Sequence, residues 1–377
     1  MSNSSPDVPI TAPAPSSESE VDAYGYDGEV IHQPDYSIVV PVIDDPLDSS
    51  AGINARRFLQ TAIALAADND GRVVLLGIAE VDDKATLKQI REYASLGGMA
   101  EGQEQSAPEL VIERQSQLAQ VVSIAGEINP NVPVRATVQT VTNTTQGILD
   151  ALAGRSETAV LLLQGTGFDK SWLLGKNMIE TVIEEANCDV FVENVGVQEG
   201  TDALYVPDIE DHTVASLSEP VAKTIDSILL PVGTGPHAAL ASEAARAVAR
   251  ASNASVTVLH VIPPDASSKK WNDAKGLLKF AEFVLGSDAE SETELREATD
   301  PADVIIQEAK NHDFTSIGSP ERKSGLWDLV FTPVQEALAD RNDVTVLMSR
   351  DADRTMRSLY YRYKQAIGDE ESDGNSE

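Results

Sequence analysis

A short hydrophobic run occurs twice in the chain, and this repeat limits the fold more than any other feature of the sequence. Residues 37–42 read Ser-Ile-Val-Val-Pro-Val, and residues 227–232 read Ser-Ile-Leu-Leu-Pro-Val. Each run is followed by an alanine-rich segment of helical character and then by a second hydrophobic run, at 55–67 and 72–78 in the first copy and at 238–251 and 255–261 in the second. Near-continuous apolar runs are typical of strands that are buried on both faces of a parallel sheet.

The later part of each copy also repeats in order. The first copy continues with a strand at 134–140, a helix at 144–153, a strand at 158–163, a helix at 174–186 and a strand at 190–193. The second continues with a strand at 293–297, a helix at 301–310, a strand at 314–317, a helix at 333–339 and a strand at 344–348. A βαβαβαβαβ order in both copies predicts two tandem α/β domains, each a doubly wound, Rossmann-like parallel sheet.

Composition places the domain boundaries. Residues 1–34 are polar, acidic and rich in proline, so they cannot repay the entropy of ordering and are predicted to be a disordered acidic tail. We expect the first domain at 35–195, a linker at 196–225 and the second domain at 226–350. Residues 351–377 are predicted to hold a basic and aromatic helix, followed by an acidic tail.

The charge balance limits the partners of the protein. The formal net charge is −33, from 61 acidic and 28 basic residues. Such a field repels phosphate backbones and anionic lipid, which excludes nucleic acid as a general partner. Molar salt screens this self-repulsion, because the Debye length falls to about 3 Å at 1 M. The charge therefore indicates a halophilic source.

Two absences in the sequence predict the location. No apolar run approaches the length of about 20 residues that a transmembrane helix needs, which predicts no membrane insertion. No Lys or Arg precedes Arg56, so the basic region of a secretory signal is missing. The single cysteine, Cys188, cannot form an internal disulfide and is predicted to begin a buried strand. We expect a cytoplasmic protein.

Three features of each copy together carry a resemblance to a known family: the strand–Pro–Val opening, the glycine- and hydroxyl-bearing loop after the fourth strand, and the final strand that begins at Asp-Val. The chain resembles a tandem of universal stress protein (UspA-like) domains over about residues 36–194 and 226–350, and with its charge it resembles a haloarchaeal member. The resemblance implies a stress-response regulator, with ATP as the cofactor of nucleotide-binding members. It also implies that the two halves pack as an intramolecular pseudo-dimer.

The first domain holds the better candidate for a nucleotide loop. Nucleotide-binding members of the family carry Gly-x2-Gly-x9-Gly-Ser/Thr, and this sequence offers Gly165, Gly167, Gly175 and Lys176 in a compressed version. Glycines let backbone amides approach phosphates, and the next helix presents its unpaired N–H groups. Two interpretations stand: a phosphate site, or glycines that only shape a turn between strand and helix. Lys176 is either a phosphate ligand or a plug that fills the site.

The second domain departs from the same pattern. Gly318 and Thr332 fit it, but Glu321 and Phe331 stand where the second and third glycines belong. A carboxylate repels phosphate and a phenyl ring blocks the backbone approach, so we expect no phosphate site there.

The resemblance also places an aspartate after the first strand, near the adenine and ribose, where this chain has Asp44 and Asp45. The alternative role for Asp44 is to cap the following turn. Residues 233–235 of the second domain, Gly-Thr-Gly, are either a small anion nest or a simple turn.

No catalytic or metal motif is visible. The five histidines are scattered without metal-binding spacing, and there is no nucleophile elbow, Walker loop or Cys-x-x-Cys pair. We therefore predict that the protein is not an enzyme and has no metal site. The basic segment 354–364 is predicted to pack on its own domain or on a protein partner, with RNA or a membrane surface as the alternative.

The hypothesis from the sequence is a cytoplasmic regulatory module whose first domain senses an adenine nucleotide. The alternative is a ligand-free interaction module, such as the regulatory partner of a membrane transporter. The final strands of the two copies, near 190–193 and 344–348, are predicted edges through which the two halves meet, and a protein partner or a homo-oligomer is also expected.

Overall fold

The computed structural model describes residues 10–11, 36–43, 55–81, 84–95, 109–153, 158–163, 178–194, 225–233, 235, 237–319 and 345–352. The chain divides into two compact units, Met1–Val190 and Phe191–Glu377.

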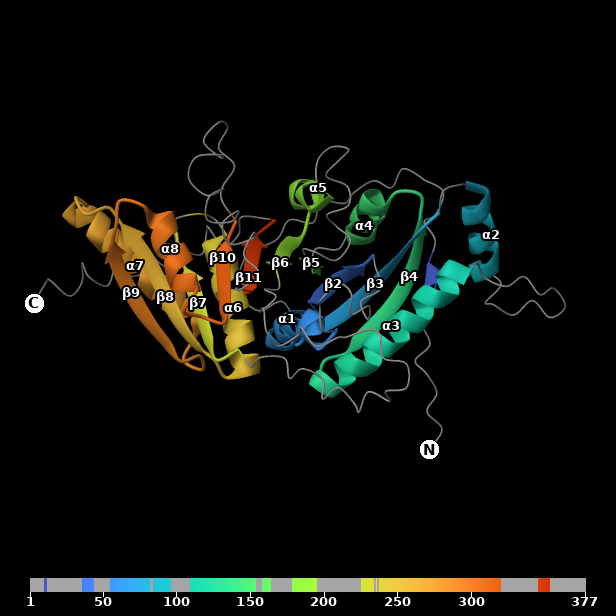
Figure 1. The fold of residues 1–377 in the computed structure, drawn as a ribbon, viewed down its shortest axis with the longest axis horizontal. Helices are drawn as coiled ribbons and strands as arrows, with labels where there is room; N and C mark the ends of the chain where they lie inside the picture. The colour runs from blue at the N-terminus through green and yellow to red at the C-terminus, as the bar shows by residue number, and fades with distance from the viewer. Residues whose placement is uncertain are drawn as a thin grey trace, which may run out of the picture. The chain divides into compact units, whose positions relative to one another are not determined.

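The first half of the chain contains six strands and five helices among its described residues. The strands are β1 (Ile10–Thr11), β2 (Ser37–Val42), β3 (Arg72–Glu80), β4 (Val134–Val141), β5 (Thr158–Leu163) and β6 (Asp189–Asn194). The helices are α1 (Ala55–Asp68), α2 (Lys84–Ser95), α3 (Glu109–Ile128), α4 (Thr144–Leu152) and α5 (Met178–Glu185). The strand order is β1-β4-β3-β2-β5-β6, and the pairs that join β1 through β5 are parallel (Figure 1).

The second half repeats this arrangement. Its strands are β7 (Ser227–Pro231), β8 (Ser255–Ile262), β9 (Ser291–Glu297), β10 (Phe314–Gly318) and β11 (Thr345–Arg350). Its helices are α6 (Ala238–Ser252), α7 (Ser268–Leu285) and α8 (Pro301–Ala309). The strand order is β11-β10-β7-β8-β9, with parallel pairing throughout.

Both halves therefore place their strands in the same order. The first strand of each repeat, β2 or β7, is central; the next two strands lie on one side of it, and the fourth strand, β5 or β10, lies on the other side. The predicted α/β class with doubly wound parallel sheets is confirmed. The apolar composition explains it, since every residue of β2 and β5 is buried. A strand that is covered on both faces needs apolar side chains in both directions.

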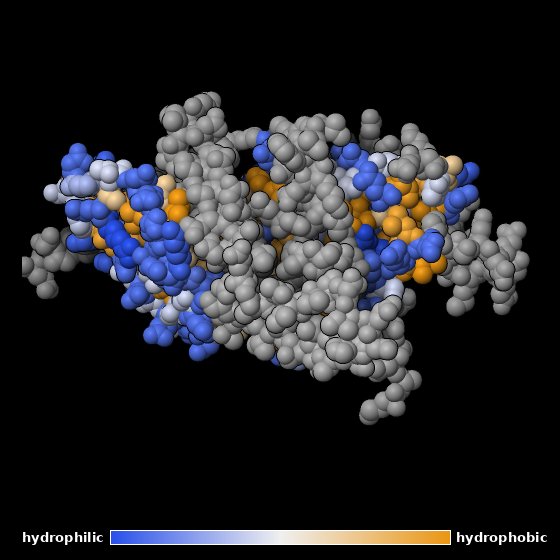
Figure 2. Space-filling view, in the orientation of Figure 1, coloured by the Kyte–Doolittle hydropathy of each residue, from blue (hydrophilic) through white to orange (hydrophobic). Residues whose placement is uncertain are grey.

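Helices cover both faces of each sheet. In the first half, α1 and α3 pack together against the sheet and α4 lies on the other face; in the second half, α6 and α7 share one face and α8 covers the other. Side-chain caps fix where three of these helices begin: Asn143 for α4, Ser267 for α7 and Asp300 for α8. Hydrophilic residues dominate the visible surface of the second unit around α8 and β9 (Figure 2).

Several elements differ from the sequence prediction. Ile10 and Thr11 pair with Val138 and Gln139 at the outer edge of β4, so the expectation of a disordered tail at 1–34 is corrected for these two residues. Two helices, α2 and α3, connect β3 to β4 where the alternating order implies one. The predicted linker 196–225 lies outside the described residues except for Ile225, as does the helix at 333–339. The predicted C-terminal helix and tail also lie outside them, beyond Ala352.

No helix in the described part of the chain is long and apolar enough to cross a lipid bilayer.

Candidate functional site

Each half contains a point where the strand order reverses. In the first half β2 lies between β3 and β5, and in the second half β7 lies between β8 and β10, so the chain leaves the central strand in opposite directions on either side of it. In open parallel α/β sheets, ligands bind beyond the carboxyl ends of the strands at such a point. The candidate sites are therefore the carboxyl ends of β2 and β5 and of β7 and β10.

In the second half, the end of β10 packs directly against the start of α6. A Cβ atom added to Gly318 would lie 2.9 Å from the carbonyl carbon of His237 and 3.0 Å from the amide nitrogen of Ala238. These are backbone atoms, which cannot give way as the end of a flexible side chain can. The absence of a side chain at Gly318 is therefore required by helix–strand packing.

Hydrogen bonds close the same edge around His237. This side chain is buried, and its Nδ1 accepts a hydrogen bond of 3.0 Å from the backbone amide of Asp351, just after β11. The amide of Ser319 donates to the carbonyl of Ser349 at 2.7 Å, which joins the ends of β10 and β11. The hydroxyl of Ser316 donates to the carbonyl of Ala241 in α6 at 2.8 Å. The start of α6 is thus tied to both neighbouring strands.

Two described glycines, Gly233 and Gly235, follow β7. An anion nest alternates right-handed and left-handed backbone, and the left-handed residue needs a positive φ. Neither Gly233 nor Gly235 has a positive φ, whereas Gly286 does. The carbonyl of Gly235 accepts a 3.4 Å hydrogen bond from the amide of Ala238 at the start of α6. This bond joins the segment after β7 to the start of α6.

The corresponding edge of the first half receives a buried arginine. Arg114 of α3 is 8% exposed, and its guanidinium donates a hydrogen bond to the carbonyl of Ile43, immediately after β2. Gly77 of β3 makes room for it, because a Cβ there would lie 2.9 Å from Cγ of Arg114 and 2.6 Å from Cδ1 of Leu118. A permanent positive charge therefore lies at the carboxyl end of β2, one residue before Asp44.

Arg114 was not among the residues that the sequence analysis selected. The signal for it is its position in α3, where the buried residues are Val111, Arg114, Leu118, Val121 and Ala125. A charged residue at helical spacing on an otherwise apolar face is a buried charge, and such charges are paired or hydrogen-bonded.

The residues that the sequence analysis proposed for the nucleotide lie outside the described residues: Asp44, Gly165, Gly167, Gly175, Lys176 and Thr332. Their places in the chain are nevertheless informative. Asp44 follows Ile43, the last described residue after β2, and the segment 164–177 connects β5 to α5. Both segments therefore leave the sheet at the strand-order reversal of the first half.

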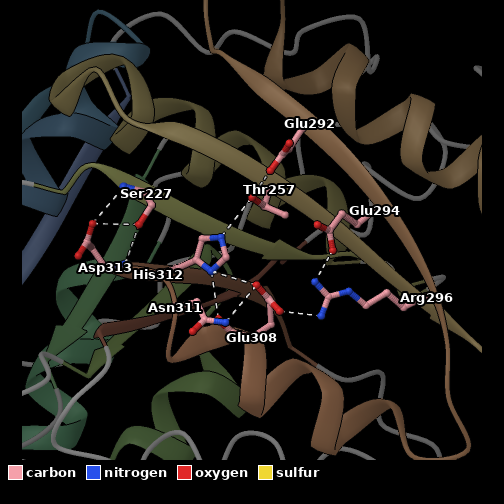
Figure 3. Close-up of polar contacts among 9 residues, drawn as sticks. All are labelled: Ser227, Thr257, Glu292, Glu294, Arg296, Glu308, Asn311, His312 and Asp313. Atoms are coloured by element: carbon pink, nitrogen blue, oxygen red, sulfur yellow. Dashed lines mark hydrogen bonds and ion pairs between the residues drawn. The ribbon is translucent and has the colours of Figure 1, made fainter.

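A polar network extends from the opposite, amino-terminal edge of the second sheet, at Ser227 and Asp313, along the α8 side to Arg296 near the end of β9 (Figure 3). Nδ1 of His312 donates to the carbonyl of Glu308 at 3.0 Å, and its Nε2 lies 3.2 Å from Oγ1 of Thr257. Arg296 joins Glu308 at 2.6 Å and Glu294 at 2.5 Å. Asp313 accepts from the amide and the hydroxyl of Ser227 at 3.1 and 3.0 Å. These bonds link β7, β8, β9 and α8.

The ion pair between Arg296 and Glu308 shifts the pKa values of both side chains. Burial of Glu308 acts to raise the pKa of its carboxyl group, but hydrogen bonds from Arg296 and Asn311 outweigh burial and hold that pKa below its usual value. The hydrogen bond to Glu308 raises the pKa of Arg296 against the opposing effect of burial. The groups pair with one another, so the arrangement indicates a structural role.

Within the described ranges, no group of three or more His, Cys, Asp or Glu side chains is arranged to hold a metal ion.

The repeated parallel sheet, with its central strand at a reversal of strand order, defines a doubly wound α/β protein. Residues 224–350, which contain the second repeat, match the model of the Universal stress protein family.

Solved structures with similar folds include a universal stress protein from Archaeoglobus fulgidus DSM 4304, with 15% identity, a TM-score of 0.47, and coverage of 85% of this chain and 98% of that one. The cytoplasmic domain of a prokaryotic cation chloride cotransporter has 15% identity and a TM-score of 0.48, with coverage of 86% and 99%. The universal stress protein from Archaeoglobus fulgidus in complex with dAMP has 19% identity and a TM-score of 0.27, with coverage of 33% and 98%. No curated protein matches the chain.

Proposed function

We propose that this protein is a non-catalytic cytoplasmic regulator with two universal-stress-protein-like domains, and that the first domain binds an adenine nucleotide such as ATP. The family match of residues 224–350 supports this assignment for the second domain. The same strand order in the first half supports it for the first domain.

The observation that carries the proposal is the position of the reversal between β2 and β5. Asp44 follows β2, and Gly165, Gly167, Gly175 and Lys176 stand between β5 and α5. The strands that precede these two segments, β2 and β5, end at the edge where sheets of this kind bind ligands, which supports the assignment. At this edge, glycines allow a phosphate to reach the backbone amides of the loop and of the following helix.

Charge supports a phosphate at the same edge. The protein carries a net charge of −33, which opposes the approach of any nucleotide. The guanidinium of Arg114 at Ile43 and the ammonium of Lys176 are local exceptions in this background. A charge-assisted hydrogen bond from such a group contributes about 1.5–3 kcal/mol.

The second domain is proposed to bind no nucleotide. Its first loop glycine, Gly318, is required for packing on His237. Glu321 and Phe331 replace the glycines that would admit phosphate, which leaves Thr332 as an isolated match to the pattern. The regulatory signal would therefore come from one half of the molecule.

Equilibrium dialysis with labelled ATP in molar potassium chloride tests the proposal. We expect one site per chain, loss of binding in Gly175→Phe, and unchanged binding in the matched second-domain variant Thr332→Ala. Lys176→Ser decides the role of the lysine: weaker binding identifies a ligand, and tighter binding identifies a plug. Release of labelled phosphate during the same incubation would contradict the non-catalytic assignment.

Two results would change the proposal. If Thr332→Ala abolishes binding while Gly175→Phe does not, the site belongs to the second domain. If neither the parent nor the variants bind ATP, the ligand-free interaction module, such as a regulatory partner of a membrane transporter, becomes the preferred function.

The proposal includes an intramolecular pseudo-dimer. Two units with the same strand order are suited to pack together as the two subunits of a homodimer do. A protease site inserted between residues 196 and 225 tests this. We expect the two fragments to elute together from a sizing column after cleavage; separate elution without denaturant would contradict the pseudo-dimer.

A further inference from the structure

Helix α7 (Ser268–Leu285) presents an exposed face with a charge opposite to that of the protein. One side of the helix packs on α6, β8 and β9, with the buried residues Ala274, Leu277, Leu278, Phe280, Ala281, Val284 and Leu285. The helix carries four lysines and two acidic residues, in a chain with 28 basic and 61 acidic residues. Its net positive charge is therefore a local feature.

The lysines lie on the outer surface of the helix. Lys269, Lys270, Lys275 and Lys279 are all exposed. Within the part of the chain that the structure describes, none of their ammonium groups forms an ion pair or a hydrogen bond. Lys275 and Lys279 are four residues apart and so point the same way. We call the surface formed by the exposed residues Asn272, Lys275, Lys279 and Phe283, together with the half-buried Gly276, the α7 face.

A glycine in the middle of this face is unexplained by the fold. Gly276 lies inside the helix, where glycine costs about 0.5–1 kcal/mol relative to alanine. A Cβ atom added there would meet no atom within 4 Å, so neighbouring elements do not require its absence. Because Gly276 has no side chain, the helix backbone beside Lys275 and Lys279 is uncovered, and another chain can approach it closely. Phe283, 55% exposed, adds an apolar contact on the same side.

The C-terminal end of α7 is held by the fold, which makes the α7 face a fixed platform. The buried guanidinium of Arg246 in α6 donates a 2.8 Å hydrogen bond to the carbonyl of Val284. Gly286, with φ of 75°, ends the helix and donates its N–H to the carbonyl of Glu282 at 3.0 Å. A rigid surface loses little entropy when a partner docks on it.

From these observations we infer that the α7 face binds an acidic peptide segment of a partner protein. The lysines supply complementary charge, Gly276 supplies room for the backbone of the peptide, and Phe283 supplies an apolar contact. A second copy of α7 is a poor occupant, because a symmetric contact would place lysine against lysine.

Two other classes of anionic partner fit less well. An interfacial helix buries its apolar side in lipid, but the apolar side of α7 is already buried in the domain core. A phosphate backbone or an anionic bilayer also meets the whole field of a protein with net charge −33. A peptide segment is small enough to experience mainly the local charge.

The probe for the test is a fluorescein-labelled poly(Glu) peptide, with poly(Lys) of the same length as its opposite. Binding to the full chain is followed by fluorescence anisotropy at the lowest potassium chloride concentration that keeps the protein folded. We expect poly(Glu) to bind more weakly as salt rises, because exposed charge pairs are screened. Lys275→Glu with Lys279→Glu should weaken binding by about tenfold or more, since two attractive contacts become repulsive.

The matched control has the same change in net charge at other exposed lysines, Lys88→Glu in α2 with Lys310→Glu in α8. Equal weakening in both double variants would show a general charge effect and overturn the inference. A bulky, uncharged replacement of the glycine in the α7 face, Gly276→Phe, should also weaken binding by a few fold while circular dichroism stays unchanged.

Three results would contradict the proposed occupant. Failure of poly(Glu) to bind the full chain would overturn the inference directly. Binding that appears only after deletion of residues 353–377 would assign the α7 face to the acidic end of this chain instead. Lysine-dependent binding to phosphatidylglycerol vesicles, without binding to poly(Glu), would identify a membrane surface.

Discussion

The backbone amide of Asp351 donates a 3.0 Å hydrogen bond to Nδ1 of His237, although the two residues are 114 positions apart. The bond requires Nδ1 to be without a proton, so the ring proton of a neutral His237 is on Nε2. It connects the residue before α6 to the chain just after β11, at the carboxyl edge of the second sheet. The start of α6 is therefore held by a side chain whose replacement can be tested.

His237→Phe keeps most of the buried volume and removes the acceptor. We expect a loss of about 1–3 kcal/mol in the free energy of unfolding, the usual cost of leaving a buried donor without a partner. Urea unfolding followed by circular dichroism measures it. A change of only a few tenths of a kcal/mol would mean that the bond contributes little.

Gly318→Ala should destabilise the second unit. Its added Cβ would lie 2.9 Å from the backbone of His237, so α6 or β10 must shift, at a cost of about 1–3 kcal/mol. Gly235→Ala is the matched control, because a Cβ there meets nothing within 4 Å, and we expect a change within about 0.5 kcal/mol. Equal midpoints of urea unfolding for the two variants would refute the packing argument.

Gly276→Ala should stabilise the protein, in contrast to Gly318→Ala. The position is helical and open, so alanine adds no clash and limits the freedom of the unfolded chain. We expect a gain of about 0.5–1 kcal/mol in the free energy of unfolding. A loss of stability would indicate that an unseen contact already requires glycine at this position.

Glu308→Gln tests the polar network through pH. The folded-state pKa of Glu308 lies below its ordinary value of 4.5, since hydrogen bonds from Arg296 and Asn311 outweigh burial, which is the largest single effect and acts to raise it. The carboxylate thus contributes stability that is complete above about pH 4.5 and is lost as the pH falls through the lower folded value. We expect the parent to be more stable than the variant at neutral pH, with the difference shrinking below about pH 4.5. A difference that is constant with pH would contradict this.

The net charge of −33 predicts a strong dependence of folding on salt. Unscreened carboxylates repel across the surface of each unit, and screening at molar salt reduces that repulsion. The melting temperature should therefore rise from low salt to molar potassium chloride. A melting temperature that is the same in both conditions would contradict the electrostatic argument.

Most of the strands could be predicted because they are apolar runs, with the polar β9 as an exception. The run at 158–163 coincides with β5, and the run at 314–317 differs from β10 by one residue. The alternating order implied helices at α3 and α7, but it did not predict where they begin and end. Arg114 interrupts the apolar pattern of α3, and four lysines and Gly276 interrupt that of α7. Strand β1 has two residues and no period to detect, so only its pairing with β4 defines it.

The candidate site was less predictable than the fold. The glycine loop and Asp44 were selected by spacing alone, and they stay predictions because they lie outside the described residues. The contacts of Arg114 with Ile43 and of His237 with Asp351 join residues 71 and 114 positions apart. Such contacts depend on the folded sheet, and a single sequence carries no periodic signal for them.

The outer edge of the third repeated strand differs between the two halves. In the first half β1 pairs with β4, whereas among the described residues no strand pairs with the outer side of β9. An uncovered edge is a template for the strand addition that starts aggregation, but β9 carries Glu292, Glu294 and Glu297. Strands of identical chains in register would place these carboxylates side by side. The resistance of this edge to fibre growth therefore depends on its row of glutamates, and replacing them with apolar residues would remove it.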